Sequence, residues 1–393
     1  MLFVPSALGA GCNAIFGIDD PEHRTGDTGA SSGSPNGGAN ATGGKGSSGS
    51  STGGKSGTSS GDGGTSGTPP SGGRGGDAGM PTGGASGDAG MPTGGAGGGG
   101  SCPDDPSDCE PPDVPSCVGL SKTACAGESC CSSPIVAGCS MCAFPSGHQS
   151  SVSSFRLDEF EVTVARFRNY VNAYTGPPAS NAGASVPGTG WSPTWDASMP
   201  GTAQALRDHV MRCGTTSTYT PDAGQNEQKP INCLSWYEAF AFCAYDGGFL
   251  PTEVQRTYAA ADGTLNFRFP WGTDELDHTH ALWGYCSMGF STSCALDDIT
   301  EVGSFPTGVG FYGQHDLTGS MWEWVFDYQG DVWPIGENCT DCVNTVPQSG
   351  GARQIRGGGW TESMLEQPVT WRMSNDLPDS VWKNVGVRCA RGI

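Results

Sequence analysis

The chain has 393 residues, 65 of them glycine, and a formal net charge of −21 at pH 7. So acidic a chain would repel the phosphate backbone of nucleic acids, and DNA and RNA are therefore not expected as partners. The glycine content is too high for one uniform globular fold, but the length allows one large domain beside non-globular segments.

Residues 1–18 resemble the N-terminus of a bacterial lipoprotein. A short apolar run ends in small residues directly before Cys12, in SALGAGCNAIFG. In such proteins the cysteine is lipidated and its acyl chains hold the protein on a membrane. The alternative is a simple secretory signal, because no basic segment precedes the apolar run. Either way we expect an extracytoplasmic protein, lipid-anchored to a bacterial membrane or cell surface through Cys12, or secreted.

Residues 19–101 consist almost entirely of Gly, Ser, Thr, Ala, Pro and Asn, and GDAGMPTGGA occurs twice, at 76–85 and 87–96. Such a sequence cannot bury enough apolar surface to offset the entropy lost on ordering. It is predicted to be a disordered tether, with an end-to-end span on the order of 50 Å.

Residues 102–149 form a cysteine-rich preface to the last domain, with eight of the 17 cysteines. A segment with so little apolar core is expected to depend on disulfides, which indicates an oxidising compartment. The spacing does not reveal which cysteines pair. CSMC at 139–142 is also compatible with half a zinc knuckle, but no matching His or Cys pair lies nearby in the sequence.

Residues 150–393 are predicted to form one large domain that begins with a strand and three helices. The first helix has a buried stripe at helical spacing, formed by Phe167, Tyr170, Val171 and Tyr174. Each predicted helix starts at a residue that can cap backbone N–H groups. These caps are Thr163, Ser235 with Glu238, and Thr252 with Gln255.

Beyond Phe267 the helical period disappears, and Gly, Trp and Pro separate short apolar runs. A few helices followed by a long region of loops and short strands predict an irregular α+β fold rather than alternating βαβ units. Within this region, DLTGSMWEWVFD places Trp322 and Trp324 on one face of a strand and Glu323 on the other. A carboxylate inside a packed region needs a compensating partner.

Seven segments occur in the order typical of one family: EVTVARFRNYV, INCLSWYEAFAFC, LPTEVQRTYAA, FPWG, VGSFPTGVGFYGQHDLTGSMWEWVFD, IRGGGW and NVGVRC. They resemble the signatures of the formylglycine-generating enzyme, or sulfatase-modifying factor, family. The resemblance covers about residues 150–393. It implies an irregular relative of the C-type lectin fold, held by calcium and disulfides.

The resemblance also implies a calcium site at the DLTGSMWEW turn. The matching donors are the side chains of Asp316 and Glu323 and the carbonyl groups of Gly319 and Met321. Mixed carboxylate and carbonyl oxygens suit Ca²⁺, which takes six to eight oxygen ligands. The alternative is that Glu323 pairs with an arginine such as Arg356 or Arg388. The third helix departs from the family, with Gln255-Arg256-Thr257 where Glu-Trp-Glu is common.

Two kinds of disulfide are implied by the same resemblance. Cys243 is similar to the family cysteine that pairs with the cysteine near the C-terminus, here Cys389. Local pairs are expected between Cys339 and Cys342, or between Cys286 and Cys294. The CTDC motif at 339–342 is also compatible with a redox site, but no thioredoxin-type βαβ unit surrounds it.

The family's oxidase chemistry needs two cysteines that bind copper(I), shortly after the turn that is IRGGGW in this chain. Glu362 and Gln367 stand in the matching places, and no cysteine lies between Cys342 and Cys389. Carboxylate and amide oxygens are poor ligands for copper(I), which prefers thiolates. Copper is therefore not expected, and neither is formylglycine synthesis by the known mechanism.

These observations favour a binding or structural module that has lost copper-dependent oxidation. Its expected ligand is an envelope or extracellular protein, a peptide or a glycan. The alternatives are an active enzyme of the family with altered chemistry, in which Glu362 and Gln367 line the pocket, and a purely structural, disulfide-rich surface protein.

Overall fold

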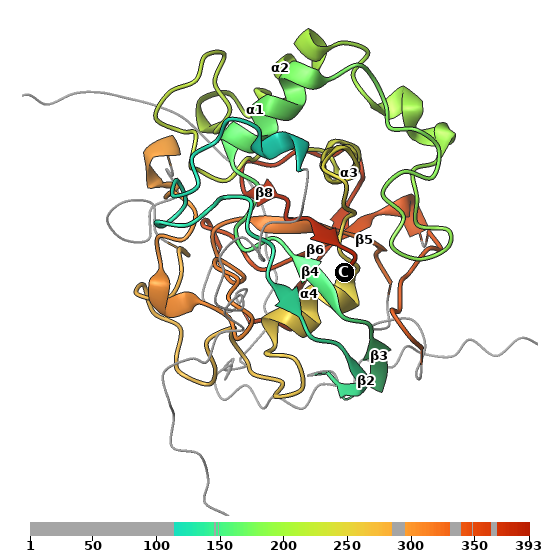
Figure 1. Cartoon of the computed structure of the whole chain (residues 1–393), viewed down its shortest axis with the longest axis vertical. Helices are drawn as coiled ribbons and strands as arrows, with labels where there is room; N and C mark the ends of the chain where they lie inside the picture. The colour runs from blue at the N-terminus through green and yellow to red at the C-terminus, as the bar shows by residue number, and fades with distance from the viewer. Residues whose placement is uncertain are drawn as a thin grey trace, which may run out of the picture. The chain divides into compact units, whose positions relative to one another are not determined.

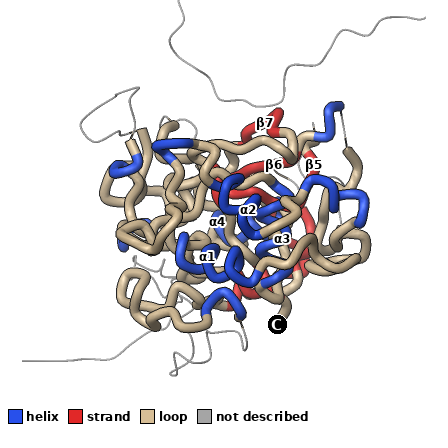
Figure 2. The backbone as a smooth tube through the Cα atoms, turned by 90° about the horizontal axis from the view of Figure 1, so that it is seen from above, coloured by secondary structure: helices blue, strands red, loops and turns tan. Residues whose placement is uncertain are grey.

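The computed structural model describes residues 114–144, 147, 149–284, 295–330, 339–347, 349–362 and 368–393. All of them lie in one compact unit, Gly87–Ile393. Several predicted features lie outside the described residues, namely the N-terminal segment with Cys12, the tether, the pair Cys286 and Cys294, and Gln367. The predicted fold class is confirmed: the structure is an irregular α+β fold in which loops connect a few helices and short strands (Figure 1, Figure 2).

The three predicted helices begin where the capping residues place them. Helix α1 is Val164–Ala173, and the Thr163 hydroxyl accepts a hydrogen bond from the third backbone N–H of the helix at 3.4 Å. Helices α3 (Trp236–Tyr245) and α4 (Glu253–Ala260) each begin with a complete capping box. Capping is chemistry within four residues, so these starts can be predicted from sequence alone.

Helix α2, Ala203–Val210, was not predicted. It is capped by Thr202 and lies against α1 (Figure 1). It has two buried residues, Leu206 and Val210, which is too short a pattern to show a helical period. No helix in the described ranges is long and apolar enough to cross a membrane.

Among the described residues, six short 3-10 helices interrupt the loops. They are Pro115–Cys117, Pro193–Ser198, Gly214–Thr216, Leu296–Asp298, Pro306–Gly308 and Ser349–Gly351.

The central sheet has four strands in the order β7-β6-β5-β8. Strands β5 (Trp322–Tyr328), β6 (Arg353–Arg356) and β7 (Arg372–Asp376) are antiparallel, whereas β8 (Val385–Gly386) runs parallel to β5. Strand β5 is buried on both faces. Both indoles of the WEW motif belong to the main hydrophobic core, together with buried residues of α1 and α3.

Two smaller sheets include strands of the cysteine-rich preface. Strands β1 (Ile135–Val136), β4 (Phe155–Leu157) and β9 (Ala390–Arg391) form a three-stranded sheet in the order β1-β4-β9. Strands β2 (Cys139–Ala143) and β3 (Gln149–Val152) pair antiparallel. The preface therefore contributes strands to the same sheets as the large domain.

Disulfides and buried ion pairs hold the loops in place. In the structure Cys243 is bonded to Cys389, 146 residues away, and Cys339 to Cys342. These are pairings that the resemblance implied. The other four bonds among the described residues are Cys117–Cys131, Cys125–Cys130, Cys139–Cys142 and Cys213–Cys233. So many disulfides are typical of an extracytoplasmic protein.

A buried network of four charges joins the helices to the C-terminal strand. Arg166 of α1 contacts Asp158 at 2.9 Å and Asp246 at 2.6 Å, and Arg391 of β9 contacts the same two carboxylates. These side chains are at most 5% exposed. Both carboxylates thus have cationic partners, which is the condition for keeping a charge inside a protein.

The long-range disulfide should contribute more stability than the local one. In the chain-entropy model, closing a loop of about 147 residues is worth about 5 kcal/mol and closing one of four residues about 2 kcal/mol. We therefore expect the double variant Cys243→Ala/Cys389→Ala to lose more free energy of unfolding in urea than Cys339→Ala/Cys342→Ala, with all other disulfides intact. Equal losses would contradict a role of Cys243–Cys389 as the principal cross-link.

Candidate functional site

The turn that leads into β5 has an unusual backbone. Asp316, Gly319 and Ser320 have positive φ angles of 57°, 77° and 58°. At Gly319 a side chain is also excluded by space, because a Cβ atom would lie 2.4 Å from the carbonyl oxygen of Leu282. The turn therefore approaches a neighbouring backbone segment more closely than any residue but glycine allows.

Glu323, at the end of this turn, is buried between two arginines. Arg256 Nε of α4 donates to Glu323 Oε2 at 2.9 Å, and Arg388 Nε donates to Oε1 at 3.0 Å. Burial by itself would raise the pKa of Glu323, but the two guanidinium groups outweigh it and lower that pKa below its usual value. Arg388 was a predicted partner of Glu323. The other suggested arginine, Arg356, pairs instead with Glu253 at 2.9 Å.

Two further buried carboxylates accept hydrogen bonds at this turn. Glu161 accepts hydrogen bonds from the backbone N–H of Met321 at 2.9 Å and from the Ser320 hydroxyl at 2.8 Å. Asp316 accepts one from the backbone N–H of Gly303 at 2.7 Å. Burial and the neighbouring acids raise the pKa of Glu161 well above its usual value, and burial raises that of Asp316 to about 6. Glu161 was not singled out from the sequence.

The residues of the turn do not fit the calcium ion that the resemblance implies. Each oxygen of Glu323 already accepts an N–H from a guanidinium group, and one oxygen of Asp316 accepts a backbone N–H. An ion at this carboxylate would lie beside two fixed positive charges. Within the part of the chain that the structure describes, no group of three or more His, Cys, Asp or Glu residues is placed so that it could hold a metal ion.

The second candidate site follows β6, at the IRGGGW turn. Glu362 Oε1 accepts hydrogen bonds from the Thr361 hydroxyl at 3.0 Å and from the Asn384 amide. Gly359 lies so close to this carboxylate that a Cβ atom there would be 2.4 Å from Glu362 Oε2. The carboxylate thus cross-links its own turn to the segment before β8. Gln367, its predicted neighbour in the pocket, lies outside the described residues.

No free thiol accompanies Glu362 among the described residues. Their twelve cysteines form the six disulfides given above. A copper(I) centre built from thiolates therefore has no ligands in this part of the structure.

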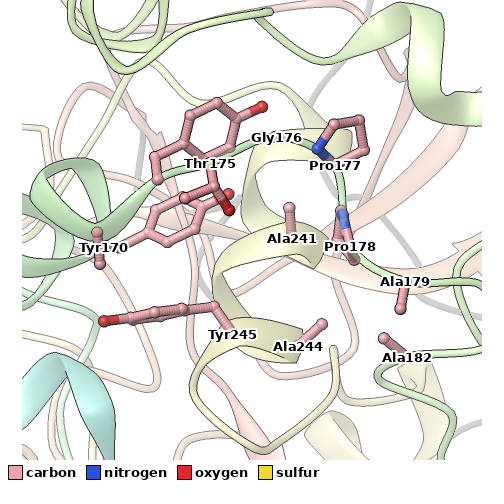
Figure 3. Close-up of a pocket in the computed structure, with 12 residues that line it drawn as sticks. Tyr170, Thr175, Gly176, Pro177, Pro178, Ala179, Ala182, Ala241, Ala244 and Tyr245 are labelled. Carbon is pink, nitrogen blue, oxygen red and sulfur yellow. The ribbon is translucent and has the colours of Figure 1, made fainter.

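A pocket of about 220 Å³ lies where the end of α1 meets α3 (Figure 3). Its lining is neutral and consists mainly of aromatic, proline and alanine side chains. Tyr170, Tyr174 and Tyr245 provide the aromatic rings, and Pro177 and Pro178 provide the opposite edge. Such a lining suits an apolar group without charge.

Tyr170 brings a buried hydroxyl group to the lining of this pocket. Tyr170 is 3% exposed, and its hydroxyl has no hydrogen-bond partner among the described residues. The Tyr174 hydroxyl, by contrast, donates to the carbonyl oxygen of Pro200 at 2.6 Å. A buried hydroxyl without a partner is costly, so its retention needs a reason. The sequence showed both tyrosines only as a buried helical stripe.

The family model for the sulfatase-modifying factor enzyme 1-like domain matches residues 137–393. The chain belongs to this family, as the ordered motifs indicated. The match begins at residue 137, within the preface and next to β1 and β2.

Both active and inactive members are among the relatives. The chain is 27% identical over 267 residues to the formylglycine-generating enzyme of Bos taurus, covering 61% of this chain and 66% of that protein. It is 32% identical over 179 residues to the inactive C-alpha-formylglycine-generating enzyme 2 of Mus musculus, covering 43% and 52%. The chain thus spans about two thirds or less of these relatives, and family membership alone does not assign an activity.

Among solved structures, PvdO from Pseudomonas aeruginosa is similar with a TM-score of 0.43 and 21% identity, over 66% of this chain and 93% of that one.

The partnerless hydroxyl leads to a stability prediction. We expect Tyr170→Phe to leave the free energy of unfolding unchanged or to raise it by up to about 1 kcal/mol, because a buried unsatisfied group is removed. Tyr174→Phe is the matched control and should cost about 1 kcal/mol, since it breaks the bond to Pro200. Urea unfolding of both variants measures the difference. A loss for Tyr170→Phe as large as that for Tyr174→Phe would mean that its hydroxyl has a partner in solution.

Proposed function

We propose that this chain is a formylglycine-generating-enzyme-like domain that does not oxidise cysteine with copper and acts as an extracytoplasmic binding module. The observation that carries the proposal is Glu362. It stands where the family places a copper-binding thiol, and its carboxylate is engaged with Thr361 and Asn384. An oxygen ligand held in this way neither binds copper(I) well nor transfers electrons to dioxygen.

A second candidate function is an active enzyme with altered chemistry, with Glu362 and Gln367 lining its pocket. The carboxylate of Glu362 gives this alternative a group that can bind a substrate or exchange a proton. Its hydrogen bonds to two side chains favour a structural role instead.

An aldehyde assay separates the two functions. The full chain is supplied with copper(I), dioxygen and a cysteine-containing peptide with a sulfatase motif, and the aldehyde is detected by mass spectrometry. We expect no conversion above buffer, because the thiol pair that handles oxygen is absent. An active formylglycine-generating enzyme assayed in parallel shows that the conditions support turnover. Conversion by this chain would defeat the proposal.

The pocket between α1 and α3 is the proposed ligand contact. Its lining carries no charged side chain, and three tyrosines contribute to the wall of a volume of about 220 Å³. The free Tyr170 hydroxyl can donate to a carbonyl oxygen. We therefore propose that the ligand is a peptide with an exposed proline, whose ring packs on tyrosine while the adjacent carbonyl accepts from Tyr170.

Saturation-transfer NMR with the full chain tests this contact. The probes are the capped tripeptides Ala-Pro-Ala, Ala-Asp-Ala and Ala-Lys-Ala. Of the three, we expect saturation transfer only to Ala-Pro-Ala, at the protons of its proline ring. Tyr170→Phe should weaken binding roughly tenfold, the value of one buried hydrogen bond. Ala244→Leu should abolish binding by filling the pocket. Equal transfer to all three peptides, or unchanged binding by both variants, would exclude this pocket.

We further propose that Cys12 carries a lipid anchor and that residues 19–101 serve as the tether between the membrane and the binding module. The composition of the tether and the apolar run before Cys12 support this arrangement. Mass spectrometry of the mature N-terminus distinguishes a lipidated Cys12 from a secreted chain.

A further inference from the structure

Two guanidinium groups span the turn before β5 from one end to the other. Arg256 contacts Glu323 through Nε at 2.9 Å and donates from Nη2 to the carbonyl oxygen of Leu317 at 2.6 Å. Arg388 contacts the other oxygen of Glu323 at 3.0 Å and donates from Nη2 to the carbonyl oxygen of His315 at 2.6 Å. Each arginine thus joins the carboxylate at the end of the turn to a backbone carbonyl at its beginning.

A calcium ion bound at a turn has the same structural role. A bound ion gathers carbonyl and carboxylate oxygens that are distant along the chain and neutralises their charge. A guanidinium group does the same with N–H donors, because five donors in a fixed plane reach several oxygens at once. Of the implied calcium ligands the two guanidinium groups bind Glu323, and they add the carbonyl oxygens of Leu317 and His315.

The surroundings of Arg256 are shaped for its side chain. Arg256 is fully buried, although arginine side chains are usually exposed in proteins. Gly357 has a φ of 109°, and a Cβ atom there would lie 2.7 Å from Arg256 Nη2. Glycine at this position therefore leaves the space that the guanidinium occupies. Arg256 also stands where the family commonly has tryptophan, so this cation is a feature of the present chain.

We infer that the guanidinium groups of Arg256 and Arg388 replace a calcium ion at the Asp316–Glu323 turn, so that the fold does not depend on calcium. Removing the charge of Arg256 leaves Glu323 with one partner and opens space among the oxygens of the turn. The Arg256→Gln variant is therefore destabilised and becomes responsive to calcium. This inference is independent of the proposed ligand and of the absence of oxidase activity.

Thermal unfolding of the full chain and metal analysis test the inference together. After dialysis against EGTA the natural chain should hold far less than one equivalent of calcium, and its Tm should be the same in EGTA and in millimolar CaCl₂. One tightly held equivalent, with a Tm that falls on chelation, would overturn the inference.

The variants locate the effect at this turn. In EGTA, Arg256→Gln should unfold about 5–10 °C below the natural chain, because a buried ion pair is broken. CaCl₂ should restore part of this difference in the variant only. A variant as stable as the natural chain in EGTA would overturn the inference.

If Arg256→Gln does not fold, the calcium dependence of Tm can be measured on Arg256→Lys instead. Lysine retains the charge but not the planar fork, so this variant should have an intermediate Tm that calcium does not change. A calcium-dependent Tm for Arg256→Lys would contradict replacement of the ion by the positive charge. As the matched control, Arg168→Gln removes an arginine that is 12% exposed and paired with Glu227, away from this turn, and should respond to calcium no more than the natural chain does.

Discussion

The carboxylate of Glu323 is the point on which the interior of this domain depends. It is fully buried, and it is tolerated there because Arg256 and Arg388 each supply a charged N–H donor. The three residues come from strand β5, helix α4 and the C-terminal segment. Their contact therefore fixes the relative positions of parts of the chain that share few regular hydrogen bonds. In a fold made mostly of loops, such side-chain contacts replace the ladder of a large sheet.

Helices α1, α3 and α4 could be predicted because their capping contacts join residues close in sequence. The contacts of the candidate site join residues that are distant in sequence. The capping residues act on N–H groups two or three positions away, so the sequence contains the whole signal. Glu323 lies 67 residues from Arg256 and 65 from Arg388. Alternation along the WEW motif showed that the carboxylate needs a compensating charge, but which charge approaches it is decided by the fold. Helix α2 and the unpartnered hydroxyl of Tyr170 were both missed. The helix has too few buried residues to show a period, and a tyrosine in a helical stripe looks like core.

The proposed absence of copper-dependent oxidation and the Arg256 contact rest on the same kind of replacement. At the IRGGGW turn an oxygen-bearing side chain, Glu362, stands at the expected position of a thiol and bonds to Thr361 and Asn384. At the turn before β5 the guanidinium group of Arg256 holds Glu323, one of the implied calcium ligands, together with the carbonyl oxygen of Leu317. In both places hydrogen bonds within the chain take over contacts that would need a metal.

A framework held by internal contacts also explains why the proposed ligand contact lies at α1 and α3. Helix α1 is fixed at its N-terminal half by the pairs of Arg166 with Asp158 and Asp246, both fully buried. Helix α3 is fixed by the disulfide of Cys243 to Cys389. The Tyr170 ring is therefore packed between two helices that are each tied to other parts of the fold. A rigid, unsatisfied donor in a neutral pocket loses little entropy when a carbonyl group reaches it, which is the condition under which one hydrogen bond contributes most to binding.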